Sequence, residues 1–136
     1  MALKVLYQVD VGHADPVETL ERTLAGEPEA VASYVRILVT GTLEHLEETD
    51  RRLGAAAVGW RPERMARVDR AVLRLAAYEI FHREDVPFAV AVNEAVELGK
   101  RYSGQEAARF INGVLSGLSR GEGGTAPDPD SPVGAS

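Results

Sequence analysis

Apolar residues recur along most of this chain at steps of three and four, which is the spacing of one face of an α-helix. The pattern predicts helices over about residues 2–11, 16–25, 28–58 with at least one break, 64–83, 88–101 and 103–118. No segment alternates apolar and polar residues over four or more positions, so no strand is predicted. The expected fold class is all-α, with two antiparallel helix groups that share a core.

Short local patterns mark where several of these helices begin and end. Asp15 suits a helix N-cap, and Glu18 lies three residues later, which is the spacing of a capping box. Ser103 and Glu106 repeat that spacing ahead of the last helix. Pro87 ends the preceding helix, because proline disfavours helical geometry in the residue before it.

Glycine and proline interrupt the longest apolar stripe. Gly54, Gly59 and Pro62 place at least one break near its end. Asn112-Gly113, in the middle of the last helix, indicates close packing against a neighbouring helix. The positions that form the stripe are Val31, Tyr34, Val35, Leu38, Val39, Thr42, Leu43 and Leu46.

The composition is that of an ordinary globular domain, with 136 residues, 45% apolar and 26% charged. We expect a single domain over residues 1–120 and a disordered tail over 121–136, where no periodic apolar pattern remains. The chain has no cysteine, which excludes a disulfide framework, thiolate catalysis and cysteine-ligated metals. It shows no apolar run of membrane-spanning length and no secretory signal, so we expect a cytoplasmic protein without a membrane role.

The net charge of −6 hides a strong polarity along the chain. Residues 1–50 carry three basic and ten acidic side chains, whereas residues 51–120 carry twelve basic and eight acidic ones. Such a chain can present a basic face while it remains acidic overall. A solvated arginine-rich surface explains the same numbers equally well.

The helix predicted over 64–83 separates its arginines from its apolar residues. On a helical wheel, Arg67, Arg70 and Arg74 fall together opposite an apolar arc of about 160°. A row of guanidinium groups suits phosphate contact, because each offers a rigid fork of donors. Plain solvation of this face is the alternative, and these three residues alone favour it.

Two carboxylates, Asp69 and Glu79, fall inside the apolar arc of the same helix. A buried carboxylate without partners is costly, so each must be paired or lie beside a groove. For Glu79, a partner-binding groove and an internal hydrogen bond are equally good explanations. For Asp69 a structural role is favoured, because Arg70 and the preceding loop offer partners.

Aromatic and basic residues gather around the start of the last helix. Tyr102, Arg109 and Phe110 lie near its exposed N-terminus, which favours phosphate through its free N–H groups. Aromatic rings beside an arginine are typical of single-stranded RNA recognition. For Phe110 alone, core packing with Val114 is the stronger interpretation.

Enzyme motifs are missing from the sequence. His13, His45 and His82 are far apart, and none has the spacing of a zinc site such as H-E-x-x-H. The chain also lacks the glycine-rich phosphate loops and the nucleophile elbow. We therefore expect no catalysis, no cofactor and no metal site, and we interpret the chain as a binding module.

The block VDRAVLRLAAYEIFHREDVPFAVAVNEAVELGKRYSG, followed by ARFINGVL, resembles the NusB family of transcription antitermination factors, and ALKVLYQVD near the start supports this. The resemblance covers about residues 2–118. It implies about seven helices in two packed three-helix groups. It also implies binding to the boxA RNA of ribosomal-operon transcripts, a heterodimer with NusE (a ribosomal small-subunit protein), and entry into the RNA polymerase antitermination complex.

The resemblance also assigns roles to residues by position. It implies RNA contacts by the first helix and by the turn and helix near residue 105, and a place near the partner surface for Glu79. The implied RNA-contacting residues are Lys4, Tyr7, Tyr102, Glu106, Arg109 and Phe110.

Family members usually carry an arginine-rich stretch ahead of the ALKVLYQ motif, whereas Met1 directly precedes Ala2 here. With fewer phosphate contacts we expect weaker RNA binding and a flatter salt dependence. Two alternatives stay open: an adaptor that binds only protein, and a relative of the helical N-terminal domain of a ribosomal RNA cytosine methyltransferase, which shares the run VP-x-x-x-A-V-N-E-A-V-E-L.

Overall fold

The computed structural model describes residues 1–56 and 60–118, and these contain seven α-helices, one short 3-10 helix and no strand. The tail predicted for residues 121–136 lies outside the described residues. Within the described ranges, no helix has both the length and the apolar content that a membrane crossing requires. The elements are α1 (Ala2–Gly12), α2 (Pro16–Leu24), α3 (Glu29–Glu44), α4 (Leu46–Ala56), η1 (Pro62–Arg64), α5 (Arg67–His82), α6 (Phe88–Tyr102) and α7 (Gln105–Ser116).

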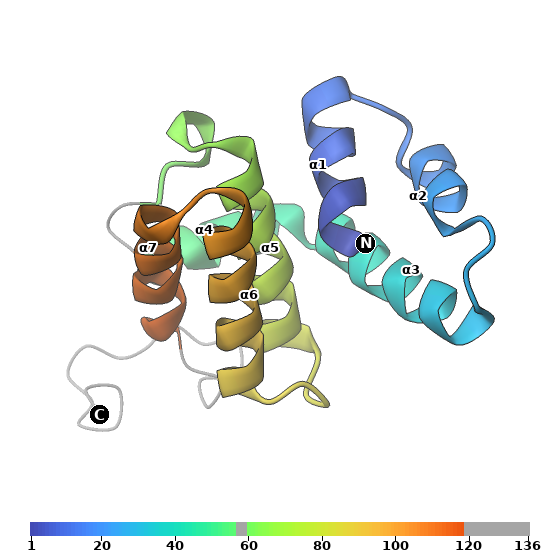
Figure 1. Ribbon diagram of the computed structural model, residues 1–136. Helices are drawn as coiled ribbons and strands as arrows, with labels where there is room; N and C mark the ends of the chain where they lie inside the picture. The colour runs from blue at the N-terminus through green and yellow to red at the C-terminus, as the bar shows by residue number, and fades with distance from the viewer. Residues whose placement is uncertain (57–59, 119–136) are drawn as a thin grey trace.

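The helices form two groups, as Figure 1 shows, so the predicted all-α architecture is confirmed. Helices α1, α2 and α3 pack together on one side, and α5, α6 and α7 pack together on the other. Helix α4 joins the second group by packing on α5. Helix α5 also contacts α1 and α3, so it connects the two groups.

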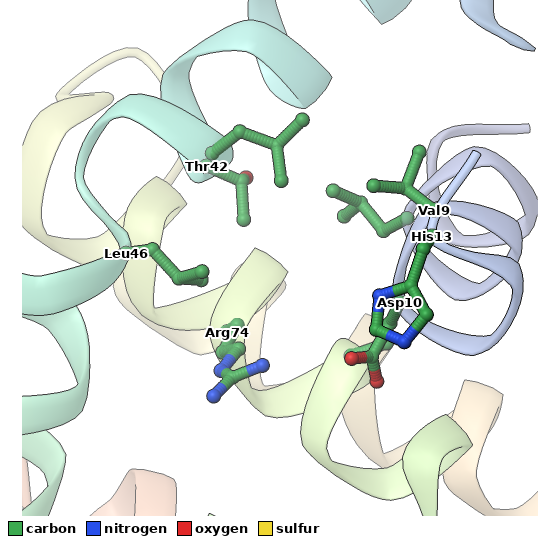
Figure 2. A pocket seen from close by; sticks show the side chains of 9 residues that line it. Val9, Asp10, His13, Thr42, Leu46 and Arg74 are labelled. Atoms are coloured by element: carbon green, nitrogen blue, oxygen red, sulfur yellow. The ribbon is translucent and has the colours of Figure 1, made fainter. Parts of the chain in front are cut away.

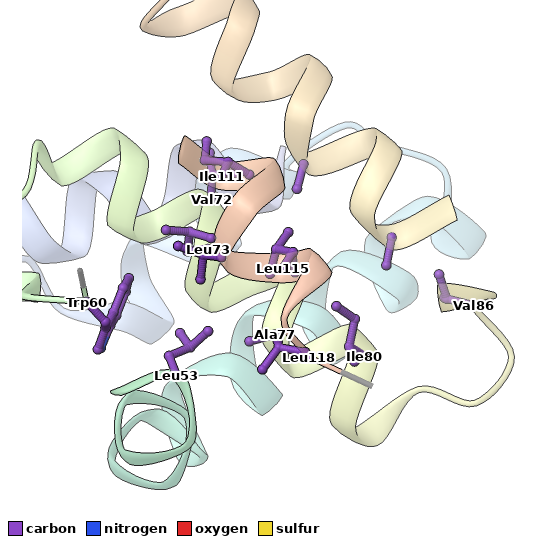
Figure 3. Close-up of a cluster of buried hydrophobic side chains, with 14 residues drawn as sticks. Leu53, Trp60, Val72, Leu73, Ala77, Ile80, Val86, Ile111, Leu115 and Leu118 are labelled. Atoms are coloured by element: carbon purple, nitrogen blue, oxygen red, sulfur yellow. The ribbon is translucent and has the colours of Figure 1, made fainter. Parts of the chain in front are cut away.

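The two groups have separate cores rather than the single shared core that we expected. α5 contributes Ala71, Leu75 and Tyr78 to the first core, and other residues, Leu73 and Ile80 among them, to the second. The second core is drawn in Figure 3, where Leu53 of α4 and Leu115 of α7 lie close to α5. α5 therefore buries two different faces, which explains why its apolar arc is so wide.

One of the two predicted capping boxes is present. The Asp15 carboxylate accepts a hydrogen bond from the Glu18 backbone N–H at 2.8 Å and so caps α2. The prediction for Ser103 was wrong. Gly104, with a φ of 106°, is the residue before α7, and the Ser103 hydroxyl instead donates to Asp69 at 2.6 Å. A positive φ suits glycine, and the tertiary contact takes the serine away from the helix end.

The long stripe of residues 28–58 breaks earlier than predicted. α3 ends at Glu44, His45 takes a non-helical conformation, and α4 begins at the next residue. Gly54 lies inside α4 and does not interrupt it. Since α3 packs into the first core and α4 into the second, the break redirects the chain from one group to the other.

Close helix packing occurs at glycines other than the one that we expected. A Cβ atom on Gly41 of α3 would overlap the Tyr78 ring, and one on Gly99 of α6 would overlap the end of the Ile111 side chain. A Cβ atom on Gly113 would meet nothing within 4 Å. The interpretation of Asn112-Gly113 as a close-packing site was therefore wrong, and Gly41 and Gly99 bring α3 onto α5 and α6 onto α7.

Candidate nucleic-acid interface

The start of α1 and the end of α6 border an open hollow of about 510 Å³. Three residues that the sequence singled out, Lys4, Tyr7 and Tyr102, line it together although they come from opposite ends of the chain. The fold brings them together because α1 and α6 both pack against α5. The full lining is Met1, Leu3, Lys4, Tyr7, Val68, Leu98, Arg101 and Tyr102.

This hollow combines aromatic rings with positive charge. The side chains of Tyr7 and Tyr102 are 38% and 58% exposed, so each ring has a face that a ligand can reach. Lys4 and Arg101 are exposed beside them and supply two cations. Arg101 was not predicted from the sequence, although it directly precedes Tyr102 in the last turn of α6. Rings that stack on bases, with cations that meet phosphates, are the chemistry of single-strand recognition.

A second hollow of about 550 Å³ lies next to the first. Val68 and Tyr102 line the first hollow, and their chain neighbours Asp69 and Ser103 line the second. The second hollow carries carboxylates instead of cations, so the charge changes sign across this boundary. Its lining is Met65, Ala66, Asp69, Ser103, Glu106, Ala107 and Phe110.

Phe110 is at the surface. Its side chain is 36% exposed, and the buried residues of α7 are Ala108, Ile111, Val114 and Leu115. The interpretation of Phe110 as a core residue was therefore wrong, because its face of α7 turns toward the second hollow. Arg109 is exposed on the same helix.

Asp69 has the structural role that we favoured, although with a different partner. Its carboxylate accepts the hydrogen bond from Ser103, which lies in the turn between α6 and α7. This contact ties that turn to the first turn of α5 and so holds the two hollows side by side.

The row of arginines on α5 is occupied by contacts within the protein. Arg70 forms a two-pronged ion pair with Asp10 of α1 at 2.8 and 2.9 Å, and it also donates to the Pro62 carbonyl. Arg74 forms a similar pair with Asp50 of α4 at 2.7 and 2.9 Å. These two guanidinium groups join helices, so the structure does not offer them as a free phosphate-binding face.

Arg67 is the exposed member of the row, and it donates to the Val11 carbonyl at 3.3 Å. A smaller hollow of about 200 Å³ lies between α1, α3 and α5, with Asp10 and Arg74 at its edge (Figure 2). Both of these charged groups already have partners elsewhere, in Arg70 and Asp50. We therefore assign no ligand to this hollow.

Glu79 lines a narrow groove of about 90 Å³ among α3, α5 and α6. Tyr34 of α3 and Glu94 of α6 line the same groove. Burial raises the pKa of the Tyr34 hydroxyl, and the negative charge of Glu79 raises it further, while Arg83 opposes the rise. The groove is therefore apolar at its base and acidic along its edge.

Exposed apolar side chains occur on two of the helices that line this groove. Tyr34 and Ile37 on α3 are each 42% exposed, and Val90 on α6 is 44% exposed. Scattered exposed apolar residues are normal, but these three lie on the two helices that form the walls of the groove. This surface has the mixture of apolar contact area and charge that protein interfaces use.

Two of the three histidines meet in space, contrary to what their spacing indicated. His45 and His82 stack with their ring centroids 4.1 Å apart, and both contact Glu48. Sequence spacing could not show this, because the α3–α4 break and the end of α5 bring the residues together from 37 positions apart.

Comparison with known proteins decides the class of the chain. The model of the NusB family matches residues 1–120. The chain belongs to the NusB family. A transcription antitermination protein NusB from Pelotomaculum thermopropionicum is 52% identical over 116 residues, covering 84% of this chain and 81% of that protein. NusB proteins are transcription antitermination factors and not enzymes, which confirms the prediction of a non-catalytic protein.

Solved NusB structures show the same fold. NusB from T. maritima superposes with a TM-score of 0.79 at 32% identity, covering 85% of this chain and 82% of that one. A structure of the antitermination factors NusB and NusE in complex with double-stranded RNA matches with a TM-score of 0.73 at 27% identity, covering 85% and 87%. The resemblance first drawn from the VDRAVLRLAAYE and ARFINGVL blocks is therefore confirmed.

Proposed function

We propose that this NusB-family protein binds boxA RNA of ribosomal-operon transcripts together with NusE, and that the pair joins the RNA polymerase antitermination complex in the cytoplasm. The observation that carries the RNA part is the hollow shared by Lys4, Tyr7, Arg101 and Tyr102. A NusB relative has been solved with both NusE and RNA, which supports the same pair of partners here.

The two hollows fit a single strand better than a duplex. Unstacked bases can lie against Tyr7, Tyr102 and Phe110, which are all exposed. Lys4 and Arg101 reach the phosphates at one end of this surface. At the other end Glu106 is an acceptor, which suits the amino groups on base edges rather than the phosphates. Arg109 adds a cation on α7, and we propose that it also contacts an RNA phosphate.

The groove at Glu79 is the proposed NusE surface. Its lining on α5 runs from Val72 to Glu79, whereas the first hollow meets α5 at Val68 and shares only Leu98 of α6 with the groove, so we expect RNA and protein to bind at the same time. Its apolar base and acidic edge suit a partner that presents an apolar segment beside lysine or arginine.

Binding to boxA RNA should exceed binding to a scrambled RNA of the same length, and added NusE should tighten it. The reason is that base stacking and base-edge contacts read sequence, whereas phosphate contacts do not. A gel-shift titration at fixed salt measures both affinities. Equal affinity for the two RNAs would exclude sequence recognition, and no RNA binding with intact NusE binding would favour the adaptor that binds only protein.

Glu79→Lys should weaken NusE association strongly and lower the melting temperature only modestly. The reversed charge would repel a basic partner at the edge of the groove. Pull-down and thermal melting on the same preparation measure both effects, and Glu47→Lys on the exposed face of α4 is a control with the same charge change. A large loss of stability in Glu79→Lys alone would show that this carboxylate serves an internal pair instead.

A further inference from the structure

The junction between α3 and α4 meets the last turn of α5 at a compact cluster of two imidazoles and one carboxylate. The Glu48 Oε1 atom lies 3.2 Å from His45 Nδ1 and 3.2 Å from His82 Nε2. One ligand atom from each of the three residues lies within 4.8 Å of the others. None of the three residues lines the RNA hollows or the Glu79 groove, although His82 lies one turn after Glu79 on α5, and neither proposed partner accounts for the cluster.

The distances match those within a metal coordination shell. With metal–ligand bonds of roughly 2.0–2.1 Å, neighbouring ligands of a tetrahedral zinc ion lie about 3.3 Å apart. Two of the contacts in the cluster already have nearly this length. Both ring nitrogens lie beside the same carboxylate oxygen, so the three ligand atoms border one small region, and each nitrogen can bind an ion in the tautomer that leaves it unprotonated.

The surrounding structure holds the rings in place. Tyr78 of α5 stacks against both imidazoles, with ring centroids 5.9 Å from His45 and 5.4 Å from His82. Tyr78 is itself buried in the first core. Because two of the three ligands are fixed by an aromatic stack, binding an ion would require little ordering of side chains.

The cluster is also accessible and charged. The side chains of His45, Glu48 and His82 are between 27% and 38% exposed, so an ion with bound water can enter. Glu48 supplies a carboxylate oxygen, which zinc accepts as a ligand beside imidazole nitrogens.

We propose that His45, Glu48 and His82 bind a zinc ion, with water in the fourth position. Two imidazoles and one carboxylate form a ligand set that suits zinc, whereas magnesium and calcium prefer oxygen ligands throughout. The ion would bridge α4 and the end of α5. Its role would be to fasten the α3–α4 break onto α5, and so to stabilise the junction between the two helix groups.

One neighbouring group opposes the ion. Arg52 lies over the Phe81 ring, 3.4 Å from its centroid, and its guanidinium is 3.6 Å from Glu48. This positive charge competes for Glu48 and repels a cation, so it lowers the affinity of the site. Arg52→Met removes the charge and keeps an unbranched apolar stem over Phe81, so it should tighten zinc binding.

The test uses the tag-free full-length chain, treated with EDTA and then dialysed. Competition with a chromophoric chelator measures the zinc affinity, and Co²⁺ absorption reports coordination by nitrogen and oxygen. We expect one zinc ion per chain, a rise in melting temperature on zinc addition, and no comparable effect of Mg²⁺. Because loss of even an outer-shell partner costs roughly 10–100-fold in metal affinity, loss of a direct ligand in His45→Gln, Glu48→Gln or His82→Gln should weaken binding by more than tenfold.

His13→Gln is the matched control, because His13 follows α1 and lies outside the cluster. It should bind zinc as the wild-type chain does, and Arg52→Met should bind more tightly. Circular dichroism establishes that each variant is folded, and His45→Gln and His82→Gln test the site from two different elements. The proposal is overturned if the folded wild-type chain takes up no zinc, or if His45→Gln and His82→Gln bind it as well as His13→Gln does.

Discussion

Gly41→Ala should lower the free energy of unfolding by about 1–3 kcal/mol, as expected for overpacking of a well-filled interior. A Cβ atom at this position overlaps the end of the Tyr78 ring. Tyr78 cannot move aside freely, because it is buried and stacks against His45 and His82. Either the ring leaves its stack or α3 moves away from α5, and both changes disturb the first core.

Gly113→Ala is the matched control for this substitution. Both glycines lie inside helices, but a Cβ atom at Gly113 meets nothing within 4 Å. Alanine should stabilise the chain there by roughly 0.5–1 kcal/mol, because it favours the helix over the unfolded chain. Urea denaturation of the two variants beside the wild type measures both effects. If Gly41→Ala is as stable as Gly113→Ala, the close packing of α3 on α5 makes no net contribution.

Phe110→Ala should weaken boxA RNA binding by about 1–3 kcal/mol if a base stacks on this ring. The exposure of Phe110 removes the competing expectation of a large core cavity, so the melting temperature should change little. Fluorescence titration with labelled RNA and thermal melting of the same samples separate binding from folding.

Tyr34→Ala provides a matched control for the loss of an exposed aromatic ring. Tyr34 is 42% exposed, close to the 36% of Phe110, but it lies at the groove proposed for NusE. In titrations without NusE it should leave the RNA affinity unchanged. Equal affinities for wild type and Phe110→Ala would remove Phe110 from the RNA surface, and equal losses in both variants would point to a general effect of truncation.

The periodic apolar pattern was sufficient to predict most of the helices and their two groups, although it placed the break between α3 and α4 too late and predicted one shared core. The burial of Leu73 and Ile80 could be predicted from the sequence, because an amphipathic helix buries its apolar face against the rest of the protein. The cap at Asp15 was predictable as well, since the carboxylate and the N–H that it accepts from are three residues apart. Helices and a cap that depend on residues close in sequence could therefore be predicted.

Features that depend on distant partners were not recovered. Ser103 has the right spacing for a cap, but Asp69, 34 positions away, attracts its hydroxyl. Arg70 and Arg74 form a basic row on an isolated helix, yet Asp10 and Asp50 neutralise two of its members in the folded chain. A helical wheel describes one helix and carries no information about the acids on the helices that pack against it.

The candidate site was also predicted only in part, because some of its residues come together only in the folded chain. The types of residue that the sequence singled out, Lys4, Tyr7 and Tyr102, do meet at one hollow. Arg101 was not singled out because the helical wheel covered residues 64–83 only, whereas Arg101 ends the next predicted helix. The histidine cluster was missed for a different reason, since no spacing rule connects His45 with His82.

Helix α5 buries eight of its sixteen residues on two faces, so it cannot slide or rotate against either group without opening a core. Its length therefore fixes the distance between sites that lie along it. At a rise of 1.5 Å per residue, Val68 at the first hollow and Glu79 at the groove are held about 16 Å apart along its axis. The distance between an RNA and a protein bound at these two places would be set by α5, even if both ligands are flexible.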